Sequence, residues 1–86
     1  MIFYGTMTCP DCRYAKSVLD KNKIEYEYID ILEDIKTIKE FISIRDNRKE
    51  FDELKVDGIL GVPCFLMESG EIIFDVDYLV ERKLNN

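Results

Sequence analysis

Residues 4–13 of the chain read YGTMTCPDCR, and this stretch joins a short apolar segment to a segment of helical periodicity. Residues 1–4 are apolar at both parities, which is typical of a central strand covered on both faces. Residues 13–23 predict a helix whose inward face carries Tyr14, Ala15, Val18 and Leu19, with Asn22 as a left-handed terminator. Pro10 suits the first helical position, where a missing N–H costs nothing. The stretch therefore predicts a strand, a turn and a helix with Cys9 at its N-cap.

Cys9 and Cys12 are expected one turn apart at the positive end of that helix. The N–H groups and dipole of a helix N-terminus favour a thiolate, and such placement can lower a cysteine pKa from about 8.5 to roughly 3.5–7.5. The thiolate is the nucleophile of disulfide exchange, so we predict that Cys9 attacks and that Cys12 resolves. Taken alone, a Cys-x-x-Cys motif also allows two interpretations other than disulfide exchange. The two cysteines could be small buried residues on one helix turn, or they could form half of a zinc site.

The composition limits the class of protein. The chain has 86 residues, of which 47% are hydrophobic and 35% are charged, so we expect one globular domain over residues 1–86. We found neither a membrane-length apolar run nor a basic signal-peptide start, and we therefore expect a cytoplasmic protein. A net charge of −6 argues against binding to nucleic acid or to an anionic membrane. The chain has no histidine, which excludes imidazole bases and imidazole metal ligands.

The rest of the pattern predicts five further elements. Residues 25–31 suit a strand near the sheet edge, and residues 33–56 suit two helices, or one helix broken near Asn47, with an inward stripe at Ile35, Ile38 and Ile42. Residues 64–67 and 72–74 suit a hairpin, and Asp75 can cap a last helix. The predicted order is β-α-β-α-β-β-α, an α/β fold.

With these elements in place, the chain resembles the glutaredoxins of the thioredoxin superfamily. The resemblance rests on a tyrosine that ends the first strand, on the CPDC motif, on Ala15-Lys16 in the helix and on Val62-Pro63. It implies a four-stranded mixed sheet flanked by helices, with a cis peptide bond at Pro63 beside the two thiols. It also implies a thiol–disulfide oxidoreductase that reduces protein or glutathione mixed disulfides. Such an enzyme needs no bound cofactor or metal, acts as a monomer, and is reset by glutathione or by a flavoprotein reductase.

Three positions depart from the pattern that this family uses to bind glutathione. Thr6 replaces a lysine, Asp11 replaces an aromatic residue, and Phe74-Asp75 replace a Gly-Gly pair. The remaining expected contacts are the backbone of Val62, which pairs with the ligand like an added strand, and the backbone of Val76 and Asp77 at the start of the last helix. The missing cation would have to come from the second helical region, at Arg45, Arg48 or Lys49.

Cys64 leaves two interpretations open. In an apolar strand, a cysteine usually packs as a small hydrophobic residue. Being next to Pro63, it could instead approach Cys9 and Cys12 as a third thiol. Two other functions follow as alternatives to disulfide reduction. One is a module that binds or delivers a metal or an iron–sulfur cluster through these cysteines, and the other is a redox-silent adaptor that binds a peptide at the edge near Val62.

Overall fold

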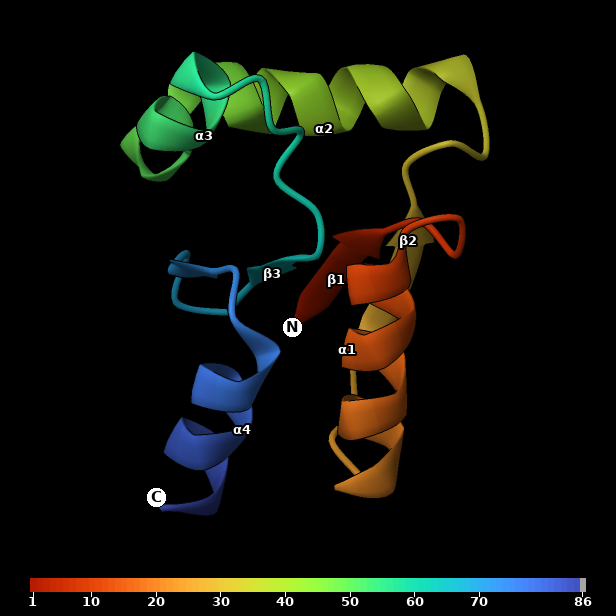
Figure 1. Cartoon of the computed structure of the whole chain (residues 1–86), viewed down its shortest axis with the longest axis vertical. Helices are drawn as coiled ribbons and strands as arrows, with labels where there is room; N and C mark the ends of the chain where they lie inside the picture. The colour runs from red at the N-terminus through yellow and green to blue at the C-terminus, as the bar shows by residue number, and fades with distance from the viewer. Residues whose placement is uncertain (86) are drawn as a thin grey trace.

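Four strands form one mixed sheet in the order β2-β1-β3-β4 (Figure 1). The structure is a computed structural model that describes residues 1–85. Strand β1 (Ile2–Gly5) pairs in parallel with β2 (Glu27–Asp30) and antiparallel with β3 (Cys64–Leu66), which in turn pairs antiparallel with β4 (Ile72–Ile73). The prediction of a central first strand and an edge second strand is confirmed.

The helices form one layer on each face of the sheet. Helices α1 (Pro10–Lys21) and α4 (Val76–Leu84) lie on one side, and α2 (Ile35–Asn47) and α3 (Asp52–Val56) lie on the other, after a short 3-10 turn η1 (Lys49–Phe51) (Figure 1). This is the predicted thioredoxin-like arrangement, with the expected helix break after Asn47. Within residues 1–85, no helix combines the length and the apolar character needed to cross a membrane.

The alternation of side chains along β1 divides the interior into two cores. Phe3 and its strand partner Phe65 face the first layer, where they pack with Cys12, Ala15, Leu19 and Leu79. Tyr4 and its partner Cys64 face the second layer, where they pack with Phe41 and Phe51. A residue's position in the strand therefore decides which helical layer it contacts.

Two details of the helices differ from the predictions. Asn22 is not left-handed, because its φ is −91°, and the positive φ of 56° belongs to Lys23. The predicted inward stripe of α2 is wrong at Ile35, which is 69% exposed, and the residue of α2 that is fully buried is Phe41. The Phe41 ring packs 5.7 Å from Tyr4, so an aromatic contact, not the isoleucine spacing, sets the buried face.

Candidate active site

Cys9 sits where the first strand's loop becomes helix α1. It is the N-cap residue, with an extended backbone at φ −93° and ψ 122°, and Pro10 follows at the first helical position. The backbone N–H groups of Cys12 and Arg13 both donate to the Cys9 carbonyl at 3.1 Å. The Cys9 side chain is half-buried and that of Cys12 is fully buried. We expected both thiols at the exposed start of the helix; Cys9 is partly exposed there, but Cys12 is covered.

The buried position of Cys12 keeps its thiol protonated. Burial raises the pKa of Cys12 to about 11, and a hydrogen bond to Cys9 together with the negative charge of Asp11 acts in the same direction. A backbone hydrogen bond from Thr6 acts against this shift without reversing it. The negative charge of Asp11 therefore helps to raise the pKa of Cys12. Cys12 therefore stays protonated while Cys9 reacts with the substrate.

Gly5 contributes to the site in a way that the sequence did not indicate. A Cβ atom at Gly5 would lie 3.0 Å from Cys12 Sγ and 2.7 Å from Cε1 of Phe3. Only a glycine leaves room for that sulfur against the strand end. Gly5 and Cys12 are seven positions apart in the sequence, so only the folded structure shows that they lie in close contact.

Thr6 is a structural residue of the loop. It is buried, its carbonyl accepts the N–H of Cys9 at 3.1 Å, and its Oγ1 lies 3.2 Å from Oγ1 of Thr8. Arg13 contacts the loop through Nη1, which donates to the Met7 carbonyl at 2.7 Å. Thr6 therefore fixes the turn, while a positive charge reaches the loop from the first turn of α1.

The Val62-Pro63 peptide bond is cis, as the resemblance implied. The loop that leads to it is anchored by Arg45, which donates to the carbonyls of Ile59 at 2.8 Å and Leu60 at 2.9 Å. Among residues 1–85, the backbone of Val62 has no hydrogen-bond partner. Its N–H and C=O are therefore free to pair with an extended ligand.

Gly61 seats the same loop on the second core. Its φ of +102° is left-handed, and a Cβ there would lie only 2.7 Å from the Phe51 ring. A side chain at this position would combine backbone strain with a steric clash. Gly61 is thus a second glycine whose role was not apparent from the sequence.

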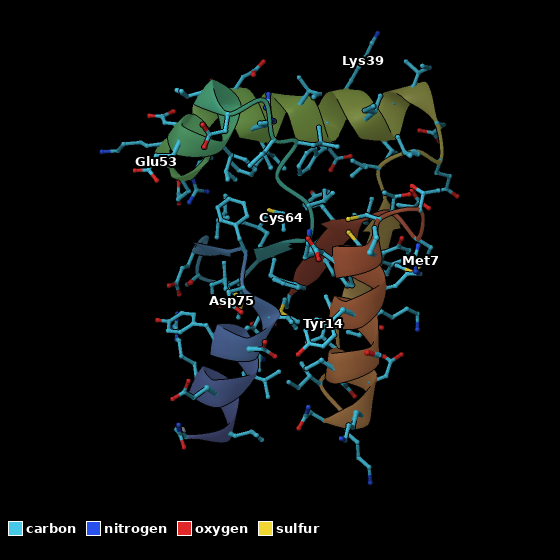
Figure 2. The ribbon with its side chains drawn as sticks, in the orientation of Figure 1. Met7, Tyr14, Lys39, Glu53, Cys64 and Asp75 are labelled. Carbon is cyan, nitrogen blue, oxygen red and sulfur yellow. The ribbon has the colours of Figure 1, made fainter. Side chains whose placement is uncertain are left out.

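A shallow pocket of about 170 Å³ brings together four predicted site residues, Asp11, Pro63, Val76 and Asp77, but neither of the two cysteines lines it. It is lined by residues from the start of α1, the cis-proline and the start of α4, which are Asp11, Tyr14, Pro63, Phe74, Asp75, Val76 and Asp77. Tyr14, expected in the core, is instead 53% exposed, and its hydroxyl donates to both carboxylate oxygens of Asp77 at 2.9 and 3.2 Å. Figure 2 shows Tyr14 on α1 and Asp75 at the beginning of α4, on facing elements.

The start of α4 is already occupied by a side chain of the protein. The Asp75 carboxylate accepts the N–H of Asp77 at 2.9 Å and the N–H of Tyr78 at 3.3 Å. The Asp77 amide, which we expected to be available to a ligand, therefore has an internal partner. Cap formation satisfies N–H groups that would otherwise attract an anion.

Cys64 does not join the other two thiols. It lies in the core between the sheet and α2, whereas Cys12 lies in the core on the opposite face (Figure 2). Burial raises the pKa of Cys64 to about 12. Its interpretation as a small core residue is confirmed. In the part of the chain that the structure describes, no three cysteine or acidic side chains are grouped so that they could hold a metal ion.

Comparison with known proteins agrees with this geometry. The family model described as Glutaredoxin matches residues 1–65, which include the loop, both thiols and the cis-proline. The chain belongs to the glutaredoxin family. It is also similar to an uncharacterized protein of Haemophilus influenzae (strain ATCC 51907 / DSM 11121 / KW20 / Rd), with 34% identity over 79 residues that cover 92% of this chain and 91% of the relative. Membership of the glutaredoxin family supports an activity of the thiol-oxidoreductase type.

Two of the three cations considered for this glutaredoxin's glutathione site have other partners. Arg45 is bound to the loop before Val62, and Arg48 forms an ion pair with Glu50 at 2.7 Å while also donating to the Gly70 carbonyl. Of the three candidates, Lys49 alone makes no hydrogen bond or ion pair through its side chain within residues 1–85. The expectation that this region supplies a glutathione-binding cation has no support from these contacts.

Proposed function

We propose that this glutaredoxin reduces protein disulfides or glutathione mixed disulfides through Cys9 and Cys12. The observation that carries the proposal is the arrangement of a reachable Cys9 at the N-cap of α1 over a buried, protonated Cys12. Cys9 is the thiol that a substrate can reach, so it is the one that attacks the disulfide. The free backbone of Val62 beside Pro63 can hold the substrate chain as an added strand.

The reaction proceeds in two exchanges. The Cys9 thiolate attacks one sulfur of the substrate disulfide, so that a Cys9–substrate disulfide forms, the substrate S–S bond breaks, and the leaving thiolate takes a proton from water. Cys12 then loses its proton and attacks Cys9 Sγ, which forms the Cys9–Cys12 disulfide and releases the second substrate thiol. The substrate gains two electrons and two protons, and the protein dithiol loses them. Glutathione or a flavoprotein reductase would return them.

The test is a single-turnover reaction of the reduced protein with bis(2-hydroxyethyl) disulfide, followed by intact mass and by free-thiol counting. Wild type should lose the Cys9 and Cys12 thiols without gaining an adduct. Cys12→Ser should stop as a stable adduct on Cys9, and Cys9→Ala should not react. Cys64→Ala is the matched control, because its thiol is on the other face of the sheet, and it should behave as wild type. Equal reaction of wild type and Cys9→Ala would instead support a redox-silent adaptor.

A second experiment identifies the reductant. Cys12→Ser is incubated with a glutathionylated peptide and glutathione, and release of the peptide is followed with time. Sustained turnover would indicate that Cys9 alone suffices and that glutathione completes the cycle. Accumulation of a Cys9 mixed disulfide without turnover would indicate that the dithiol route, and hence a reductase, is required.

A further inference from the structure

Every charged residue that lines the pocket beside the cis-proline is acidic. Asp11, Asp75 and Asp77 contribute three carboxylates, and no lysine or arginine lines it. Asp11 lies between the two cysteines in the first turn of α1, and its charge contributes to the raised pKa of Cys12. Cys9 and Cys12 do not line the pocket themselves, which adjoins the site through Asp11 and Pro63.

None of the three carboxylates is neutralised by a cation of the described chain. Asp77 accepts hydrogen bonds from the neutral Tyr14 hydroxyl, and Asp75 accepts two backbone N–H groups. Asp11 has no side-chain partner, and no ion pair within residues 1–85 includes any of the three. Tyr14 holds the Asp77 carboxylate in place across the pocket but leaves its charge intact.

The other side of the loop has the opposite character. A second hollow of about 290 Å³ is lined by Met7, Arg13, Lys16, Ser17 and Asp20. Lys16 pairs with Asp20 at 2.7 Å, whereas Arg13 is bound only to the uncharged Met7 carbonyl. The two sides of α1's first turns thus present charges of different sign to a substrate.

Taking the proposed disulfide reduction as its basis, we infer that Asp11, Asp75 and Asp77 select disulfides with a cationic group near the attacked bond. The natural source of such a group is a lysine or arginine next to a cysteine of a polypeptide. Glutathione is a poor match, because it carries two carboxylates, and the α4 amides of Asp77 and Tyr78 are already bound to Asp75. The carboxylates act as specificity determinants through attraction of cations and repulsion of anions.

The chemistry of this step is the first exchange described above. Cys9 sulfur forms a bond to the substrate sulfur nearer the cationic group, the substrate S–S bond breaks, and its electron pair leaves on the other sulfur, which takes a proton from water. Cys12 then attacks Cys9 Sγ as described above, so the two thiols together supply the two electrons of the reduction, one from each sulfur. A single turnover of the reduced protein therefore needs no added reductant.

The test uses three disulfides that differ only in the end group on each two-carbon arm: cystamine (cationic), bis(2-hydroxyethyl) disulfide (neutral) and 3,3′-dithiodipropionate (anionic). Rates are measured for wild type, for Asp11→Asn/Asp77→Asn, and for the control Asp46→Asn/Glu53→Gln, which removes two exposed charges from the α2 and α3 layer. The leaving thiols differ in reactivity. The quantity compared is therefore the cationic-to-anionic rate ratio of each variant divided by that of wild type.

We expect the ratio to fall by about tenfold in Asp11→Asn/Asp77→Asn at an ionic strength of about 0.01 M, and to change by less than about twofold at about 0.5 M, where screening is strong. Any change in Cys9 reactivity affects all three disulfides equally and cancels. A lysine-flanked cystine peptide should likewise react faster than its glutamate-flanked counterpart.

The outcomes separate this inference from the proposed function. An unchanged ratio, or an equal change in the control variant, overturns the selection of cations while leaving disulfide reduction intact. Failure of wild type to react with any of the three disulfides overturns the proposed function and the inference with it. Thermal unfolding of each variant verifies that the fold is retained, and Asn at position 77 can still accept the Tyr14 hydroxyl.

Discussion

The pH dependence of the second exchange should reveal the buried state of Cys12. A pKa of about 11 leaves only about one Cys12 in 10⁴ as thiolate at pH 7, and each added pH unit increases that fraction about tenfold. Burial is the largest cause of this shift, whereas the contributions of the Cys9 thiol are lost when Cys9 is held in a mixed disulfide. Burial alone keeps the pKa of Cys12 above its ordinary value, so the rate of Cys12 attack should increase by about 10² between about pH 7 and about pH 9 and should continue to rise above that range.

The assay mixes the reduced protein with one equivalent of 2,2′-dithiodipyridine and follows the two releases of pyridine-2-thione. The first release reports attack by Cys9, and the second reports attack by Cys12 on the mixed disulfide. Cys12→Ser should show the first release alone, which assigns the phases. A second phase that levels off near pH 9, the ordinary range of a thiol, would refute the argument that burial of Cys12 controls this step.

Three further predictions concern stability. The pKa of Cys64 is raised from about 9 to about 12 on folding, so its contribution to stability is complete below pH 9 and is lost as the pH rises toward 12. Denaturation at several pH values should therefore give Cys64→Ala a shallower alkaline loss, by about 1.4 kcal/mol per pH unit. Gly61→Ala should lower the free energy of unfolding by about 3 kcal/mol, through strain and a clash with Phe51. The matched Gly70→Ala, which has a φ of +92° but open space, should cost about 1 kcal/mol, and similar losses would contradict the clash. Arg45→Ala should cost about 1 kcal/mol and speed hydrogen exchange in residues 59–62, whereas unchanged exchange would show that its two hydrogen bonds do not hold the loop.

The sequence predicted the features that depend on local chemistry. Pro10 at a helix start fixes where α1 begins and therefore places Cys9 at the N-cap. The apolar residues at both parities of β1 indicated a strand with two covered faces, and the two cores confirm it. The cis bond before Pro63 came from the family resemblance, because the local sequence alone does not specify the isomer.

The features that the sequence did not predict depend on contacts between distant residues. Gly5 carries no sign in the sequence that Cys12 Sγ will pack against it. Tyr14 has the spacing of a core residue, yet it points to Asp77, 63 positions away, because its hydroxyl gains a carboxylate partner at the surface. Lys23 adopts the left-handed conformation because it follows the C-cap residue Asn22. The N–H groups of Lys23 and Ile24 close the helix on the carbonyls of Asp20 and Leu19.

The start of α4 suggests how this fold can keep disulfide exchange and change its substrate. A helix N-terminus attracts an anion because its first N–H groups lack partners, but here Asp75 supplies that anion from within the chain. A ligand carboxylate would have to displace the Asp75 carboxylate, which belongs to the chain and therefore loses no translational freedom when it binds the helix. The ligand would then also face the negative charge of Asp77. Cys9 and Cys12 depend on other features, namely the loop after β1 and the room left by Gly5. Asp75 and Asp77 lie at the start of a different helix from the reacting thiols, so their charge can change substrate preference without altering the exchange itself, whereas Asp11 lies between the two cysteines and also raises the pKa of Cys12.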